Sequence, residues 1–150
     1  MKVEFLLHSP PCSVNSAYYR NKQRTQKTRD WSKSIHAQLS EPVLKKKVEA
    51  LKMAFSPLKH ALHVTLCFYI PREKFYTKEG KISRRSTDLD NCIKLLLDTV
   101  FDPRFFKREL FNFNIDDQFI TDLAPIKRPA DLFSIGIEVQ ILDNKTFKPI

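Results

Sequence analysis

The segment from residue 84 to residue 98 constrains this chain most, because it combines a helical apolar period with a group of charges. Apolar residues recur at the spacing of a buried helical stripe, namely Leu89, Cys92, Ile93, Leu96, Leu97 and Val100. Asp90, Lys94 and Asp98 fall on the opposite side, one turn apart. Thr87 or Asp88 is a suitable N-cap. The sequence predicts a helix with one buried face and one face of acidic groups and a lysine.

Length and composition indicate one globular domain. The chain has 150 residues, of which 42% are hydrophobic, and this is enough for a substantial core. It has no apolar run near the roughly 20 residues that span a bilayer, and residues 1–5 lack a signal-peptide pattern. We therefore expect a cytoplasmic protein. Its three cysteines are odd in number and far apart, which favours reduced, mostly buried thiols.

The net charge of +9 is distributed unevenly. Residues 1–86 carry 18 Lys and Arg against 6 Asp and Glu, a balance of +12, whereas residues 87–150 carry 8 against 11, a balance of −3. This asymmetry favours a polyanion such as nucleic acid as partner of the first part, and a carboxylate metal site in the second. The alternative is a basic surface that only aids solubility.

The alternation of apolar and polar residues predicts strands at residues 3–7, 62–70 and 134–142, and a further strand begins near residues 118–123. Helices are expected from Thr28 or Asp30 to Leu39 and over residues 43–53. Residues 71–85 are expected to form a polar loop, and residues 143–150 a frayed tail. The order is roughly β-α-β-α-β-β. This predicts a single compact α+β domain with a small mixed sheet and two or three helices.

Two basic segments are candidate DNA contacts. The first lies in the loop at residues 14–29, where Arg20, Arg24 and Arg29 can hold phosphates and Tyr18 or Tyr19 can stack or hydrogen-bond. An exposed connection whose tyrosines pack on the core fits the loop equally well. The second segment is Arg84-Arg85, which directly precedes the acidic group.

The segment from Phe101 to Ile115 interleaves phenylalanines with basic residues. That pattern can indicate base stacking or a wedge into opened nucleic acid. Packing on the core or across a dimer interface is the more common role, and we favour it here.

Asp88, Asp90 and either Asp116 or Asp117 are candidate metal ligands. Carboxylates this close repel one another, by roughly 4 kcal/mol at 4–5 Å and an effective dielectric near 20, so a cation, a proton or arginines must offset the repulsion. Oxygen ligands with no His or Cys nearby favour Mg²⁺ or Mn²⁺. Lys94 is placed to stabilise charge that develops on a phosphate, whereas the role of Asp98 is left open.

The acidic group also has simpler interpretations. Asp88 or Asp90 can cap the helix, and Asp90 with Lys94 can form an ordinary i,i+4 pair. A D-x-D motif also occurs in metal-dependent glycosyl transfer and in aspartyl-phosphate chemistry. The latter needs aspartates at the end of a buried strand, which the polar residues before Asp88 argue against.

Three blocks, in order, resemble the RusA family of Holliday junction resolvases, which is common in bacteria and their prophages. Residues 10–20, PPCSVNSAYYR, resemble its N-terminal block, which includes Asn15. Residues 88–98, DLDNCIKLLLD, resemble its D-x-D-N-x-x-K-x-x-x-D signature, and residues 116–118, DDQ, resemble its later D-D-x-Q block. The resemblance spans most of the chain, although the stretch between Asp98 and Asp116 looks longer than is usual and is rich in Phe.

The resemblance implies a homodimer that cuts four-way DNA junctions with Mg²⁺ in DNA recombination and repair. Carried over by position, Asp88, Asp90 and Asp117 are the metal-binding residues, Asp116 is their neighbour in the metal site, and Lys94 is the catalytic lysine. Asn91 matches as well, with a role limited to orienting the site.

Two other functions stay open. One is a non-catalytic branched-DNA-binding protein with the same fold, which the intact acidic residues and Lys94 argue against. The other is a metal-dependent phosphotransfer enzyme that acts on a small nucleotide, for which DNA binding would be weak and insensitive to salt.

Overall fold

The computed structural model describes residues 1–13, 25–83, 89–101 and 113–150, and for Leu89 and Asp90 only the backbone. These residues form four strands, four α-helices and one 3-10 turn, in the order β1-α1-α2-β2-α3-α4-η2-β3-β4. The predicted α+β class and single small domain with a mixed sheet are confirmed. The predicted order is confirmed too, including both N-terminal helices, and the structure adds two short elements, α3 and η2.

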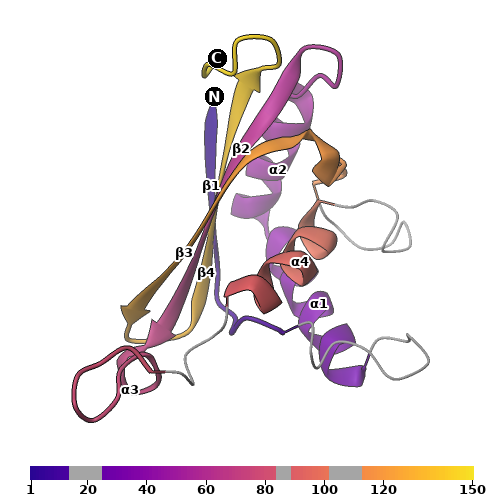
Figure 1. Cartoon of the computed structure of the whole chain (residues 1–150). Coiled ribbons are helices and arrows are strands. Elements are labelled where there is room, and N and C mark those ends of the chain that lie inside the picture. Colours follow the sequence, from indigo (N-terminus) through magenta and orange to yellow (C-terminus); the bar gives the residue numbers. More distant parts are fainter. Residues whose placement is uncertain (14–24, 84–88, 102–112) are drawn as a thin grey trace.

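The strands form one sheet in the order β1-β4-β2-β3. Strands β1 (Lys2–Leu7), β4 (Ser134–Asp143) and β2 (His60–Pro71) pair antiparallel, and β3 (Ile120–Ala130) pairs parallel to β2. The parallel pairing requires a crossover, which α4 and its flanking segments provide. In Figure 1 the sheet forms one layer, and α1, α2 and α4 lie against one of its faces.

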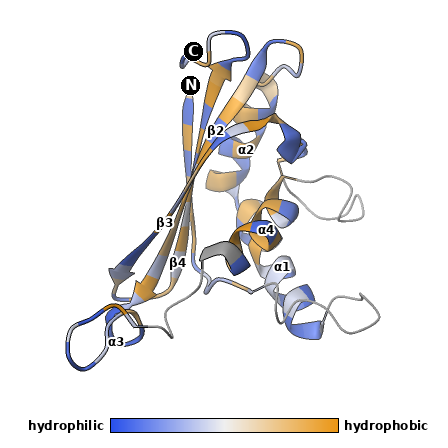
Figure 2. Ribbon diagram, in the orientation of Figure 1, coloured by the Kyte–Doolittle hydropathy of each residue, from blue (hydrophilic) through white to orange (hydrophobic). Residues whose placement is uncertain are grey.

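The alternation predicted for the central strands is confirmed. Residues Leu62, Val64, Leu66, Phe68 and Ile70 of β2 are all buried, as are Ile135, Ile137, Val139 and Ile141 of β4. Figure 2 shows this alternation as bands of hydrophobic and hydrophilic colour along the strands. Every second side chain therefore points to the helices, and the others form the opposite face.

Three helices cover the buried face. Helix α1 (Gln26–Leu39) buries Trp31, Ile35 and Leu39, as its spacing predicts. It begins earlier than expected because Thr25, rather than Thr28 or Asp30, is its N-cap, and the Thr25 hydroxyl accepts a hydrogen bond of 3.3 Å from the Thr28 N–H. Helix α2 (Pro42–Ala54) has proline in its first turn and buries Val48 and Leu51. Helix α4 comprises Leu89–Val100.

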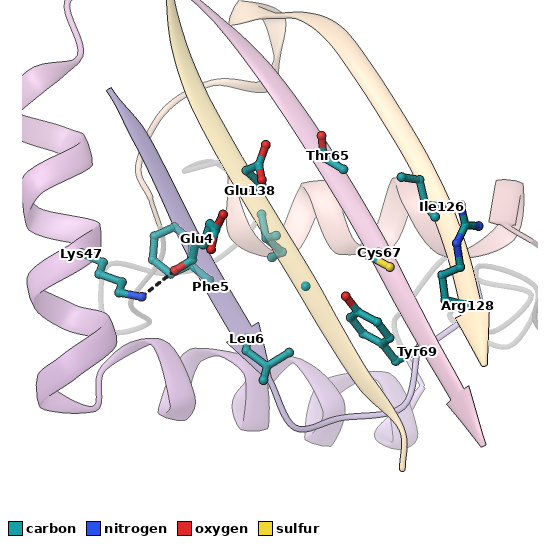
Figure 3. Close-up of a pocket in the computed structure, with 12 residues that line it drawn as sticks. Glu4, Phe5, Leu6, Lys47, Thr65, Cys67, Tyr69, Ile126, Arg128 and Glu138 are labelled. Carbon is teal, nitrogen blue, oxygen red and sulfur yellow. Dashed lines mark hydrogen bonds between the residues drawn. The ribbon is translucent and has the colours of Figure 1, made fainter. Parts of the chain in front are cut away.

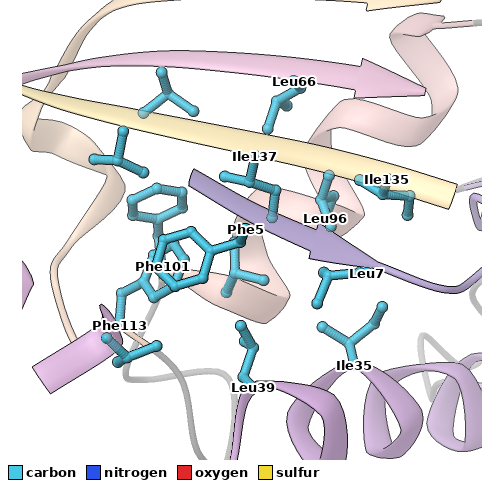
Figure 4. Packing of buried hydrophobic residues seen from close by; sticks show 14 of the residues in the cluster. Phe5, Leu7, Ile35, Leu39, Leu66, Leu96, Phe101, Phe113, Ile135 and Ile137 are labelled. Carbon is cyan, nitrogen blue, oxygen red and sulfur yellow. The ribbon is translucent and has the colours of Figure 1, made fainter. Parts of the chain in front are cut away.

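Part of the Phe-rich segment belongs to the core. Phe101 and Phe113 are fully buried, with ring centroids 4.8 Å apart and planes at 83°. The Phe113 ring also lies 4.9 Å from that of Phe5 on β1, and Figure 4 shows the three rings together beneath the sheet. The preference for core packing is thus confirmed for Phe113. Phe105, Phe106 and Phe111 lie outside the described residues.

Strand β3 is longer than its predicted start at residues 118–123 and contains Pro125 and Pro129. Proline has no N–H to donate, so it is tolerated in a strand only where no partner needs that donor. Strand β3 is the outer strand of the sheet, paired with β2. The two prolines are four residues apart, so their nitrogens face the same strand edge, and an outer strand can leave that edge unpaired.

Residues 143–150 differ from the expected frayed tail. The Asp143 carboxylate accepts hydrogen bonds of 2.8 Å from the N–H groups of Lys145 and Thr146, which shapes a turn. The chain then returns, with a bridge between Leu142 and Pro149, and the Ile150 carbonyl accepts from the amino group of Met1. The two ends of the chain therefore lie together (Figure 1).

Residues 72–83 form ordered structure in place of the expected polar loop. They begin with the short helix α3 (Arg72–Phe75) and continue as a hairpin with a bridge between Tyr76 and Ile82. Gly80 has φ +85°, a left-handed conformation that suits glycine in this turn. In the described part of the chain, no helix is long and apolar enough to cross a membrane.

Candidate functional site

Helix α4 supplies one side of the candidate site. Asp90, Lys94 and Asp98 follow one another at one-turn intervals along it. Cys92, Leu95, Leu96 and Val100 are buried, which fixes the rotation of the helix against the core. Lys94 is exposed, whereas the Asp98 side chain is only 7% exposed. The helix therefore carries a lysine at the surface and a carboxylate one turn deeper.

The second side comes from the turn η2 (Asp117–Phe119), which leads into β3. Asp116 is the N-cap of this turn, and its Oδ1 accepts a hydrogen bond of 2.9 Å from the Gln118 N–H. A short polar side chain at this position satisfies a backbone donor that the turn leaves open. Capping by Asp116 holds the next residue, Asp117, in the first position of the turn.

Lys94, Asp98 and Asp117 line one cavity of about 370 Å³ together with Ile93 and Leu97. The residues come from two elements that are distant in sequence, and the fold brings them together. Two carboxylates and one ammonium group thus share a space with two aliphatic walls. Such a setting strengthens charge interactions relative to open water, because the aliphatic walls polarise less than the solvent that they replace.

Asp116 lines a different cavity from Asp117. This neighbouring cavity has a volume of about 250 Å³ and is lined by Lys52, Phe55, Pro57, Asn114, Ile115, Asp116 and Phe119. The rings of Phe55 and Phe119 meet edge to face, with centroids 5.2 Å apart. The two consecutive carboxylates therefore have different surroundings, which separates two residues that the sequence left as alternatives.

The atoms of the 370 Å³ cavity that could coordinate a metal ion are the carboxylate oxygens of Asp98 and Asp117. No His or Cys is among its lining residues. This chemistry suits a hard cation such as Mg²⁺ or Mn²⁺. Within the described residues, no three His, Cys, Asp or Glu side chains form a metal-binding group. Two of the predicted ligands, Asp88 and the side chain of Asp90, lie outside the described residues.

The other predicted site residues are distributed as follows. Arg29 lies on α1, where its Nη2 donates to the Gln26 side-chain oxygen at 2.9 Å. Asn91 lies on α4 and is half-buried. The remaining candidates fall outside the described residues, namely Asn15, Tyr18, Tyr19, Arg20, Arg24, Arg84, Arg85 and Asp88.

Sequence reasoning left the role of Asp98 open and named neither Ile93 nor Leu97 as part of the site. The i,i+4 spacing from Lys94 to Asp98 is a signal for proximity. Ile93 and Leu97 were assigned to the buried stripe, but both are only partly buried. Their apolar character alone could not show that they also face the charged groups.

A cavity of about 560 Å³ lies on the sheet face away from the described helices (Figure 3). Tyr69 of β2 projects there, and a hydrogen bond with Cys67 raises the pKa of Tyr69. The ring packs over Gly136, where a Cβ would lie 3.4 Å from the Tyr69 Cε2, in van der Waals contact. At the edge, Lys47 of α2 donates to the Glu4 carbonyl at 2.8 Å. The lining of this 560 Å³ cavity includes none of the predicted site residues.

The family model for the endodeoxyribonuclease RusA matches residues 8–141. This span includes most of the sheet and the cavity lined by Lys94, Asp98 and Asp117, here called the acidic cavity. This chain therefore belongs to the RusA family. The family implies a nuclease that acts on Holliday junctions. No curated protein with significant similarity to the whole sequence was found.

Proposed function

We propose that this protein is a Mg²⁺-dependent endonuclease that resolves four-way DNA junctions by paired phosphodiester hydrolysis. The observation that carries the proposal is the cavity shared by Lys94, Asp98 and Asp117, in a chain of the RusA family. A lysine beside carboxylates is a combination that suits phosphodiester hydrolysis. The carboxylates attract a cation, and the lysine favours the charge of the phosphate as it is displaced.

Asp88, Asp90 and Asp117 are the proposed ligands of Mg²⁺, for which Mn²⁺ can substitute. Asp116 is a weaker candidate, because its Oδ1 already accepts the Gln118 N–H and it borders a different cavity. When bound, the ion would polarise the phosphate and lower the pKa of an attacking water. The donor set supports a hard cation of this kind, since the acidic cavity offers carboxylate oxygens.

Lys94 is the proposed electrostatic catalyst. Its ammonium group would lie against the non-bridging oxygens of the scissile phosphate and favour the more highly charged transition state. Asn91, one residue after Asp90 on α4, would orient the neighbouring carboxylate. Asp98, deep in the cavity, would hold Lys94 or the ion in place.

The DNA would be held by the basic first part of the chain. Arg20, Arg24 and Arg29, with Tyr18 and Tyr19, form one proposed set of backbone contacts, and Arg84 and Arg85 form a second set directly before the acidic residues. Arg29 supports the first set, since it lies exposed near the start of α1. Contacts of this kind bind phosphates without reading sequence.

Resolution of a junction needs two incisions, so we propose that the protein acts as a homodimer with one site per subunit. A twofold axis would place two identical sites on strands of like polarity. We further propose that it serves DNA recombination and repair in the cytoplasm of a bacterial cell, encoded by the bacterium or by a phage.

The decisive experiment uses a synthetic four-way junction and a linear duplex of matched sequence, each incubated with and without Mg²⁺. We expect paired incisions in the junction with Mg²⁺ and little cleavage of the duplex. The variant Asp90→Asn should still bind the junction but not cut it. Cleavage by Asp90→Asn at the wild-type rate would overturn the site assignment. Junction binding without cleavage in either Mg²⁺ or Mn²⁺ would favour the non-catalytic DNA-binding alternative.

A further inference from the structure

Residues 72–83, here called the arm, extend beyond the ends of β2 and β3 (Figure 1). Hydrogen bonds close the hairpin in the arm at both its tip and its base. At the tip, the Thr77 N–H donates to the Lys81 carbonyl at 2.7 Å, and the Gly80 N–H donates to the Thr77 carbonyl at 3.0 Å. At the base, the Ser83 N–H donates to the Phe75 carbonyl at 2.8 Å. The arm therefore has a defined shape before it meets any partner.

The base of the arm is fixed to the rest of the molecule. Phe75 is buried, and the Lys127 ammonium lies 5.9 Å from the centre of its ring. The Lys74 ammonium lies 4.9 Å from the centre of the Phe133 ring, and Arg72 pairs with Asp131. Cation–π contacts and an ion pair from α3 to β3 and the turn after it hold the arm in one orientation.

The outer surface of the arm carries exposed apolar side chains together with lysines. Tyr76 and Ile82 are bridge partners, and they are 38% and 61% exposed. Leu132, in the turn that contacts α3, is 77% exposed. Lys78 and Lys81 flank the hairpin tip, and the ion pair of Lys81 with Glu79 is exposed and long at 4.0 Å. An exposed apolar pair next to a tip that carries two lysines suits DNA contacts that combine phosphate binding with stacking on a base.

The arm also lies close to the proposed site along the chain. Leu89, the first residue of α4, is six residues after Ser83, so the two lie within about 21 Å of each other. At about 3.4 Å per base pair, this is the length of roughly six base pairs. The arm is therefore near enough to contact DNA that is bound at the α4 site.

We propose that the arm is a second DNA-binding element, with Lys78 and Lys81 on backbone phosphates and the Tyr76–Ile82 pair against a base pair exposed at the branch point. This inference rests on the proposed function. In continuous duplex each base pair is covered by its neighbours, whereas at a branch the pairs lose part of that cover. An apolar pair on a rigid arm would gain more from the branched substrate, and the arm would thereby favour junctions over duplex.

The test measures the dissociation constants of the full chain for the four-way junction and the matched duplex by fluorescence anisotropy without divalent metal. The first two variants are Ile82→Ser and Tyr76→Ala/Ile82→Ser. In the double variant we expect junction binding to weaken about tenfold, with duplex binding little changed. Lys78→Ala/Lys81→Ala should weaken binding to both DNAs and reduce the slope of log K against log salt by about 2. Ile82→Ser alone should weaken junction binding in the same direction. Because Ile82→Ser leaves Tyr76 in its edge-to-face contact with Phe75, with ring centroids 4.9 Å apart, this result excludes loss of that contact as the cause.

Matched controls lie at the far end of the molecule. Met53→Ser removes an apolar side chain that is 89% exposed on α2, and Lys145→Ala/Lys148→Ala removes two exposed lysines after β4. Neither should change junction preference. Equal junction binding by the wild type and all three arm variants would overturn the inference. So would a shift from dimer to monomer in Tyr76→Ala/Ile82→Ser, because the arm would then contact a second copy of the chain. Failure of the wild type to cut junctions would count against the proposed function alone.

Discussion

Asp116 and Asp117 are consecutive residues with carboxylates in different surroundings. Asp116 caps the turn η2 and borders the cavity formed with Phe55 and Phe119, whereas Asp117 borders the cavity that contains Lys94. The two residues therefore should not be equivalent in function, although the sequence presents them as a pair.

Asp117→Asn should abolish most junction cleavage, and Asp116→Asn should not. A lost metal ligand removes several kcal/mol of transition-state stabilisation, so we expect the cleavage rate of Asp117→Asn to fall about a hundredfold or more. Asparagine is as good a cap as aspartate, so Asp116→Asn should fold normally and cut within about tenfold of the wild-type rate. Single-turnover cleavage of a labelled junction measures both rates. Equal losses in the two variants would contradict the separation.

Asp98 should contribute to the affinity for Mg²⁺. A ligand that binds only the folded state raises the melting temperature, with about 2.7 kcal/mol gained at one hundred times its dissociation constant. The Mg²⁺-dependent rise in melting temperature should therefore be smaller in Asp98→Asn than in the wild type. Differential scanning fluorimetry at several Mg²⁺ concentrations, without DNA, measures this. Asp30→Asn, an exposed substitution on α1, serves as the control. A rise in Asp98→Asn equal to that of the wild type and of Asp30→Asn would show that Asp98 does not contribute to Mg²⁺ binding.

The arginines of residues 14–29 should determine much of the salt dependence of binding. Replacing Arg20, Arg24 and Arg29 by Ala should weaken binding to DNA of any sequence. The slope of log K against log salt should fall by about 3, because each lost phosphate contact reduces the slope by about 1. Titrations at several salt concentrations measure it. An unchanged slope would place these arginines away from the DNA.

Phe113 should be a major contributor to stability. It is fully buried between Phe5 and Phe101, and loss of such a ring leaves a cavity. We expect Phe113→Ala to lower the free energy of unfolding by about 3–5 kcal/mol. Urea denaturation followed by circular dichroism measures it. A loss under 1 kcal/mol would show that the three rings are not part of the cooperative core.

Asp143 should stabilise the C-terminal turn in a pH-dependent way. Hydrogen bonds from the N–H groups of Thr146 and Lys145 hold the pKa of Asp143 below its ordinary value. Its contribution to stability is therefore present above the ordinary carboxyl pKa and is lost as the pH falls through the lowered one. Asp143→Asn should melt at a lower temperature than the wild type near neutral pH, and the difference should vanish in strong acid. A difference independent of pH would contradict the prediction.

Local patterns determined much of this fold from sequence alone. The alternation in residues 62–70 and 134–142 identifies two strands and their buried faces, because it repeats a geometric period of the backbone. The helical period after Asp88 identifies a helix but not its whole buried face, which includes Leu95 and Asp98 and leaves Ile93 and Leu97 only partly buried. The motifs at residues 88–98 and 116–118 likewise identified the family, since they combine specific residue types at fixed spacings.

The tertiary structure decided what spacing cannot express. Which of Asp116 and Asp117 lines the cavity that contains Lys94 depends on a capping hydrogen bond and on the tertiary placement of η2 and α4. The position of Asp98 deep in the same cavity depends on the packing of α4, and β3 tolerates its prolines because it is the outer strand. Residues 72–83 look like a polar loop in sequence, yet cation–π contacts and an ion pair attach them to residues far along the chain. Contacts between distant residues leave no local period in a sequence, so only the folded chain reveals them.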